Sequence, residues 1–193
     1  LKNSDCSDIW LCGQGKKPTL PHFNSIHKIN GSVISAVDLI KGIGKLCGLN
    51  VLNVEGATGY LDTNYKGKVS AALGSLKKDD FCMIHIEAPD ETGHEGDYEK
   101  KIQAISDLDE KVVGPIMEGL KAGHDEYKIC IVSDHPTPVD IRTHSYEYVP
   151  YLIFDSRLNK NKHNQNTFSE RSANESSLIH DDGHKLLASF LKN

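Results

Sequence analysis

The sequence of 193 residues lacks the features that mark membrane-bound, exported or nucleic-acid-binding proteins. It has no apolar run near the roughly twenty residues that a membrane span requires. It has no basic segment followed by an apolar one, as in an export signal. Its net charge of −5 leaves no basic field for nucleic acid or an anionic membrane. These absences favour a globular cytoplasmic protein without a nucleic-acid or membrane partner.

Paired-cysteine and nucleophile motifs are missing as well. The five cysteines are odd in number and show no CxxC spacing, which argues against a disulfide framework or a thiolate zinc site. No serine stands in a GxSxG context, which argues against an α/β-hydrolase triad. Gly13-Gln14-Gly15 lacks the lysine and the Ser/Thr of a P-loop. No residue therefore stands out as a nucleophile.

Apolar runs bounded by Gly, Pro, Asn and Asp alternate with segments of helical period. This alternation is typical of βαβ units, so we predict an α/β fold with a mainly parallel sheet flanked by helices. Strands are predicted over 8–12, 31–35, 50–54, 81–87, 127–133 and 149–154, and helices over 37–47, 65–77, 97–121 and 180–191. A kink or break is expected at Gly114-Pro115, and a solvated loop from 155 to about 177.

Five acidic and histidine residues lie near predicted strand ends: Asp90, His94, Asp134, His135 and His144. In open α/β sheets, functional groups gather beyond the carboxyl ends of the strands. Carboxylate and imidazole donors suit manganese or zinc and, less well, magnesium. We therefore predict a centre of two divalent ions that supports phosphoryl transfer. The alternative for each residue alone is an ordinary solvated loop position.

The local sequence indicates how the donors of the first ion meet. Pro89 ends a strand and Gly93 permits a tight reversal, so a loop turns His94 back toward Asp90. His144 lies on the approach to the next strand and completes this ion.

Asp134 and His135 are adjacent in the sequence. Adjacent side chains in extended backbone point opposite ways. By this rule we expect the two side chains to serve two ions rather than one.

Three further residues are candidates for substrate binding: Arg142, Gly59 and Asp62. Arg142 lies two residues before His144, and the other two belong to the glycine-rich segment GATGYLDT. The alternative for that segment is a plain turn in which Asp62 and Thr63 cap the helix beginning near Tyr65. His85 falls inside an apolar strand, so it is interpreted as a core residue rather than a ligand.

At these residues the chain resembles the alkaline phosphatase superfamily, and within it the cofactor-independent (2,3-bisphosphoglycerate-independent) phosphoglycerate mutases of the archaeal type. The resemblance runs from about residue 7 to 155, through segments such as IWLCGQG, VEGATGYLDTNYKGK, DFCMIHIEAPDETGH and SDHPTPVDIRTHSYEYVPYLIF. It implies an alkaline-phosphatase-like metal domain that interconverts 3-phosphoglycerate and 2-phosphoglycerate through a phosphoserine, without 2,3-bisphosphoglycerate.

The resemblance also implies a division of ligands. Asp90, His94 and His144 would bind one ion and Asp134 and His135 the other, with Mn²⁺ expected first and Mg²⁺ or Zn²⁺ as alternatives. The family supplies a further Asp and the nucleophilic Ser from an N-terminal segment, and an inserted cap domain, none of which matches this sequence. We therefore expect residues 1–193 to be the C-terminal portion of the metal domain, inactive alone, with the N-terminal part of the polypeptide as its partner.

Two other functions stay open from the sequence. One is a different phosphatase or phosphomutase of the same superfamily, acting through the same ions. The other is a noncatalytic metal-binding or interaction module, because the chain shows no nucleophile.

Overall fold

The computed structural model describes residues 13–158 and 167–192. The strand predicted over 8–12 lies outside these residues. The described elements are α1 (Phe23–His27), β1 (Gly31–Ile34), α2 (Asp38–Leu46), β2 (Asn50–Leu52), α3 (Tyr65–Ser75), β3 (Phe81–Ile84), α4 (Ala88–Glu95), α5 (Tyr98–Leu108), the π-helical turn η1 (Asp109–Val113), α6 (Gly114–Gly123), β4 (Lys128–Val132), β5 (Tyr151–Asp155), α7 (Glu170–Ser176) and α8 (Gly183–Leu191). No helix in the described part is long and apolar enough to cross a membrane.

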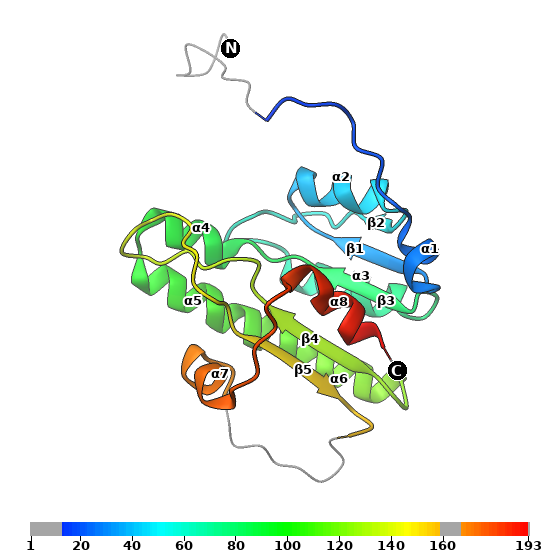
Figure 1. Cartoon of the computed structure of the whole chain (residues 1–193). Helices are drawn as coiled ribbons and strands as arrows, with labels where there is room; N and C mark the ends of the chain where they lie inside the picture. The colour runs from blue at the N-terminus through cyan, green and yellow to red at the C-terminus, as the bar shows by residue number, and fades with distance from the viewer. Residues whose placement is uncertain (1–12, 159–166, 193) are drawn as a thin grey trace.

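Three strands form a parallel sheet in the order β2-β1-β3. The central strand β1 is buried at all four positions, as expected for a parallel strand covered on both faces. Val33 contacts the α2 side, where Gly44 leaves no room for a Cβ. On the α3 side, Tyr65, Val69 and Val112 form the core cluster, with Ile84 packed against it. The predicted parallel sheet flanked by helices is confirmed (Figure 1).

The last two strands depart from the prediction of one mainly parallel sheet. β4 and β5 pair antiparallel, with Ile129 opposite Phe154, and form a separate two-stranded sheet. The connection between them, residues 133–150, is a long loop, and it lacks the helix that usually joins parallel strands.

The helical segment between β3 and β4 is interrupted, as its sequence predicted. α5 ends at Leu108, the π-helical turn η1 follows, and α6 begins at Gly114 with Pro115 in its first turn. Proline is tolerated there because the first turn needs no backbone donor. The irregularity therefore falls in the π turn just before the proline.

Two predicted loops contain helices instead. α7 lies within the segment expected to be a solvated loop, where Ser169 caps the helix by accepting from the backbone N–H of Ser172. The closing helix begins at Gly183, slightly later than predicted. The second predicted loop, which follows β3, forms helix α4 (Ala88–Glu95) instead. This helix carries two of the candidate metal ligands.

Candidate metal centre

Asp90 and His94 lie on helix α4, not on a tight reversal. Glu87 precedes the helix, Pro89 occupies its first turn, and the Oγ1 of the buried Thr92 donates to the Ala88 carbonyl at 2.7 Å. Asp90 belongs to the acidic first turn, where a carboxylate is favoured by the helix dipole. The prediction of a loop turned by Gly93 is wrong, but a spacing of four residues on a helix places both side chains on one face.

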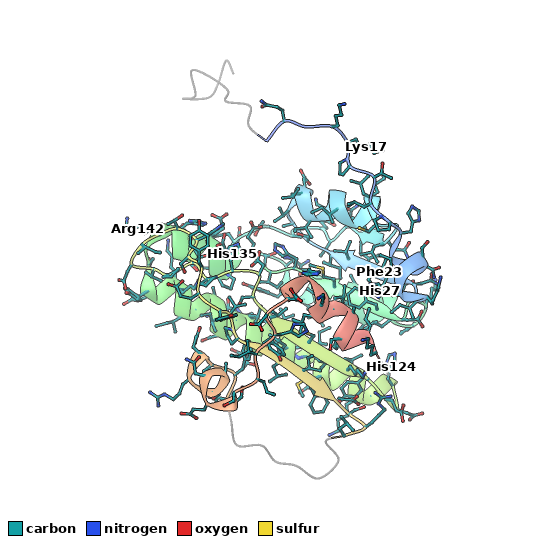
Figure 2. All side chains as sticks on the ribbon, in the orientation of Figure 1. Lys17, Phe23, His27, His124, His135 and Arg142 are labelled. Atoms are coloured by element: carbon teal, nitrogen blue, oxygen red, sulfur yellow. The ribbon has the colours of Figure 1, made fainter. Side chains whose placement is uncertain are left out.

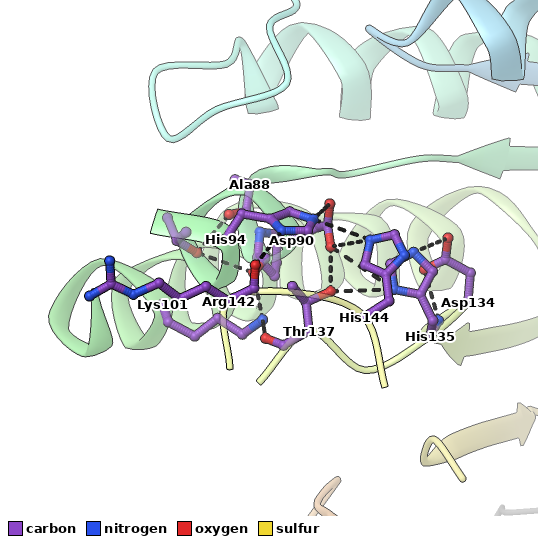
Figure 3. A network of polar contacts seen from close by, with 11 residues as sticks. Ala88, Asp90, His94, Lys101, Asp134, His135, Thr137, Arg142 and His144 are labelled. Atoms are coloured by element: carbon purple, nitrogen blue, oxygen red, sulfur yellow. Dashed lines mark hydrogen bonds and ion pairs between the residues drawn. The ribbon is translucent and has the colours of Figure 1, made fainter. Parts of the chain in front are cut away.

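His144 joins Asp90 and His94 from the loop between β4 and β5 (Figure 3). The Nε2 of His94 lies 3.2 Å from the Nε2 of His144 and 3.4 Å from Asp90 Oδ2, and Asp90 Oδ1 lies 3.6 Å from His144 Nε2. An ion with four ligand bonds of about 2.0–2.1 Å has neighbouring donors about 3.3–3.4 Å apart. The distances between neighbouring donors of the three residues are close to this spacing, with a different oxygen of Asp90 facing each histidine.

The hydrogen bonding of His94 presents the correct nitrogen to this group. Its Nδ1 lies 3.0 Å from the carbonyl oxygen of Arg142. A carbonyl only accepts, so Nδ1 carries the proton and the lone pair of Nε2 faces Asp90 and His144. Metal-binding histidines characteristically donate their second ring N–H to a backbone carbonyl in this manner.

Thr137 connects the loop to α4. Its hydroxyl donates to Asp90 Oδ1 and lies 3.3 Å from His135 Nδ1, from which it accepts. Its carbonyl accepts from the Lys101 ammonium at 3.3 Å, and a Cβ added at Gly93 would lie 2.5 Å from the same carbonyl oxygen. Gly93 is thus required for the close approach of helix and loop rather than for a turn.

Asp134 and His135 converge, although extended backbone led us to expect them to diverge. Asp134 Oδ2 lies 3.3 Å from His135 Nε2, and the His135 backbone N–H donates to Asp134 Oδ1 at 3.1 Å. The backbone bends at these two residues, and further along the loop closes back on itself, where the Ser145 backbone N–H donates to the Pro136 carbonyl. Because His135 donates Nδ1–H to Thr137, its Nε2 is free to act as a ligand beside the Asp134 carboxylate.

The two donor groups lie side by side. The rings of His135 and His144 stack with centroids 3.7 Å apart, and His135 Nδ1 lies 4.0 Å from Asp90 Oδ1. Figure 2 places His135 and Arg142 at the α4 end of the molecule, away from Phe23 and His27, the first and last residues of α1. All five predicted ligands therefore meet at one place, while metal binding itself stays a prediction.

The centre has excess negative charge. Glu87, Asp90 and Glu91 form a second acidic cluster. Burial raises the pKa of Glu87, and the carboxylates of Glu91, Asp90 and Asp134 raise it further. A divalent cation beside these groups would relieve that repulsion, which is a second argument that the residues present fit a metal ion.

The three predicted substrate residues lie in different settings. The exposed side chain of Arg142 packs over Gly96, and Figure 3 shows its guanidinium turned away from His144. A Cβ added at Gly59 would lie 3.3 Å from Glu87 Oε2, so this glycine borders the acidic cluster. Asp62 accepts from the Thr58 hydroxyl at 2.6 Å inside its own turn.

The predicted cap of α3 is wrong. Asn64 caps the helix by accepting from the Gly67 backbone N–H at 2.8 Å, while Thr63 accepts from the backbone N–H of Thr58. Sequence reasoning also missed Thr137 and Glu87. Neither has a motif of its own, and only proximity to the ligands in sequence would have suggested them.

Comparison with known proteins places the chain in a family. Residues 2–185 match the family model described as the metalloenzyme superfamily. The chain belongs to the metalloenzyme superfamily. Its match covers the sheet, α4 and the loop that carries His144, so the candidate centre lies in the part that the family shares.

Several proteins with high similarity to this chain carry a specific name. A probable 2,3-bisphosphoglycerate-independent phosphoglycerate mutase of Geobacter sulfurreducens is 45% identical over 185 residues, which are 96% of this chain and 46% of that protein. The 2,3-bisphosphoglycerate-independent phosphoglycerate mutase of Methanothrix thermoacetophila is 47% identical over 93% of this chain and 45% of its own length. The chain thus spans about half the length of these relatives.

Solved structures agree with the fold. The PH0037 protein of Pyrococcus horikoshii matches with a TM-score of 0.73 and 31% identity, over 80% of this chain and 46% of that one. The cofactor-independent phosphoglycerate mutase of Thermoplasma acidophilum matches with a TM-score of 0.58 and 25% identity, over 84% and 36%.

Proposed function

We propose that this chain is the metal-binding part of a cofactor-independent phosphoglycerate mutase, which interconverts 3-phosphoglycerate and 2-phosphoglycerate. The observation that carries the proposal is the meeting of Asp90, His94 and His144 beside Asp134 and His135. The relatives are named phosphoglycerate mutases, which favours phosphoglycerate over another phosphate ester as the substrate of this centre. The cytoplasm is the compartment we predict for it.

The proposal divides the candidate ligands into two groups. Asp90, His94 and His144 would hold one divalent ion, and Asp134 and His135 would hold the second together with donors from outside the chain. Such a pair of ions, with Mn²⁺ expected first and Mg²⁺ or Zn²⁺ as alternatives, lowers the pKa of a bound hydroxyl and offsets charge on a transferring phosphoryl group.

The residues of this chain hold and orient the ligands. Thr137 and the Arg142 carbonyl fix the rings of His135 and His94 with Nε2 toward the centre. Lys101 ties the loop to α4 through the carbonyls of Pro89 and Thr137. The resemblance to cofactor-independent phosphoglycerate mutases implies that a serine nucleophile and one further aspartate would come from the N-terminal part of the polypeptide, beside the partial metal shell of Asp134 and His135.

The direct test is conversion of 3-phosphoglycerate by the intact protein with Mn²⁺ and without 2,3-bisphosphoglycerate, followed by ³¹P NMR. We expect 2-phosphoglycerate to form, and its formation to stop in Asp134→Ala. Release of inorganic phosphate and glycerate would favour another phosphatase of the superfamily. Metal binding without any turnover would favour a noncatalytic module, and either result would contradict the mutase.

A further inference from the structure

Arg142 has a backbone conformation that residues other than glycine rarely adopt. Its φ is +53°, in the left-handed region, and within residues 13–158 and 167–192 only Lys28 and Ser177 share this property. The conformation brings the Cβ too close to the following carbonyl oxygen, so it persists only where the surrounding structure holds it. Such backbone strain next to a metal centre suggests that the Arg142 backbone has a function there.

Two hydrogen bonds hold the Arg142 backbone from either side. Its N–H donates to the Pro138 carbonyl at 3.0 Å, which closes a turn within the loop. Its carbonyl accepts from Nδ1 of His94 on α4 at 3.0 Å. The direction of a carbonyl is set by the backbone dihedral angles of its own residue. An extended or right-handed Arg142 would therefore direct this oxygen away from His94.

The side chain of Arg142 points away from the metal centre. A Cβ added at Gly96, which ends α4, would overlap the Nε and Cζ of Arg142. The guanidinium thus lies against a position that has no side chain, and Figure 3 shows it turned away from His144. Arg142 was a predicted substrate residue because of this charged group. In the structure its carbonyl, and not its guanidinium, faces one of the candidate ligands.

The carbonyl matters because the His94 ring can present either nitrogen to an ion. A flip of the ring about its χ2 bond exchanges the places of Nδ1 and Nε2, and an acceptor beside one nitrogen fixes both the orientation and the tautomer. In the described part of the chain, the Arg142 carbonyl is the acceptor beside Nδ1. It leaves Nε2 3.4 Å from Asp90 Oδ2 and 3.2 Å from His144 Nε2.

We propose that Arg142 is a positioning residue for His94 that acts through its backbone, and that its guanidinium is not a substrate ligand. The left-handed conformation aims the carbonyl at Nδ1–H, which keeps Nε2 in place for the first ion. The inference rests on the metal centre of the proposed function, but not on the identity of its substrate.

Two substitutions at this position separate the backbone from the side chain. Arg142→Val and Arg142→Gly both remove the guanidinium. Glycine adopts the left-handed conformation without strain, whereas a β-branched residue strongly disfavours it. In calorimetric titration of the intact protein with Mn²⁺, Arg142→Val should bind the first ion roughly 10–100-fold more weakly, as is typical for loss of an orienting hydrogen bond. Arg142→Gly should restore most of this affinity.

Lys28→Val is the matched control. Lys28 also has a left-handed backbone, with φ of +61°, but it follows α1, away from the metal centre (Figure 2). The substitution forces a β-branched residue into the same conformation and should leave the affinities for both ions unchanged. If Lys28→Val weakened the first ion as much as Arg142→Val, the loss would come from general destabilisation, and the assignment to Arg142 would be wrong.

The other outcomes also decide the proposal. Equal weakening in Arg142→Val and Arg142→Gly would mean that the side chain acts rather than the backbone, and would overturn it. Unchanged Mn²⁺ affinities with a higher KM for 3-phosphoglycerate in both variants would assign the guanidinium to the substrate, which also contradicts it. Selective loss of the first ion in Arg142→Val, from a protein that never turns over phosphoglycerate, would support the positioning role and reject the mutase.

A measurement on the unsubstituted protein covers the case in which Arg142→Val does not fold. The ¹⁵N shifts of the His94 ring in the intact protein loaded with Zn²⁺ report which nitrogen carries the proton. We expect the proton on Nδ1, exchanging slowly with water because it is bonded to the Arg142 carbonyl, and the same state in Arg142→Gly. A proton on Nε2 and a metal-bound Nδ1 would refute the argument.

Discussion

The candidate centre joins two regions that fix their donors by different physical means. Helix α4 supplies Asp90 and His94, whose separation follows from local helical geometry. The loop 133–150 supplies Asp134, His135 and His144, whose positions follow from contacts with distant parts of the chain. Half of the centre is therefore determined locally, and the other half exists only when the loop is docked.

The docking contacts are few and specific. Thr137 approaches Gly93 closely and donates to Asp90, and the Arg142 carbonyl accepts from His94. Every one of these contacts joins the loop to α4. Breaking the contact between loop and helix should therefore weaken the binding of both ions. Removing a single ligand should weaken the binding of one ion only.

The largest effect is expected from removing a ligand of the first ion, either from helix α4 or from the loop. His94→Ala and His144→Ala each take one of three donors from the same ion, so we expect both to lose that ion, with an affinity loss above the roughly 100-fold typical of orienting residues. The metal content of the intact protein, measured by plasma emission after dialysis, should fall by one ion in each.

The control for these variants is His124→Ala, whose ring lies near the Leu76 carbonyl and not at the centre. It should retain both ions. If His144→Ala instead lost the same ion as Asp134→Ala, the assignment of His144 to the first ion with Asp90 and His94 would be wrong.

A smaller effect is expected from separating helix and loop without touching a ligand. In Gly93→Ala the new Cβ would lie 2.5 Å from the Thr137 carbonyl oxygen, so α4 and the loop must move apart. Overpacking of this kind costs about 1–3 kcal/mol of unfolding free energy. Urea unfolding should show this loss, and Mn²⁺ titration should show weaker binding of both ions.

Gly74→Ala on α3 is the matched control for this helix substitution. A Cβ at Gly74 meets nothing within 4 Å, so the variant should be about 0.5–1 kcal/mol more stable through helix propensity. Normal metal binding in Gly93→Ala would show that the loop donors do not depend on the contact with α4.

The sequence predicted which side chains meet at the candidate centre better than it predicted the local structure that places them there. The apolar runs identified β1 and β3, because buried parallel strands leave a continuous hydrophobic signal. Helix α4 was missed because Pro89 and Gly93 are residues that usually interrupt helices. Here Pro89 lies in the first turn, and Gly93 faces the Thr137 carbonyl, which no local pattern reveals.

The loop donors were predicted by residue type and not by geometry. The rule of alternating side chains failed for Asp134 and His135 because their backbone is not extended through the turn. The antiparallel pairing of β4 with β5 was also missed, since an apolar run does not encode the direction of its partner. Contacts between residues far apart in sequence decided both cases.

The strands adjoining the two regions are stabilised by different interactions. β1, which precedes the helical region in the parallel sheet, is buried at every position. β5, which follows the loop, ends at Asp155, whose carboxylate accepts from Arg157 Nε at 3.0 Å and from its Nη2 at 2.8 Å, with Lys128 Nζ 3.8 Å away. The stabilisation that β1 gains from burial does not depend on pH, whereas the ionic contacts of Asp155 do. Acid should therefore weaken the sheet of β4 and β5 before the parallel sheet.

The smallest expected effect is therefore the pH dependence of Asp155. Hydrogen bonds from Arg157, with the charge of Lys128 adding to them, lower the pKa of Asp155 from 3.8 to about 2. Because the folded-state pKa is depressed, the stabilisation is fully present above the unfolded value near 3.8 and is lost as the pH falls through about 2.

Asp155→Asn should thus be less stable than the unsubstituted protein at pH 7, and the difference should shrink between about pH 4 and 2. Urea unfolding across this range measures the difference, and amide exchange in β4 and β5 shows whether it is local to that sheet. Asp38→Asn, which alters a carboxylate with a 96% exposed side chain, should change stability little at any pH. Equal acid sensitivity of amide exchange in β1 and β5 would contradict the contrast, because it would mean that the loop-bearing sheet has no separate ionic support.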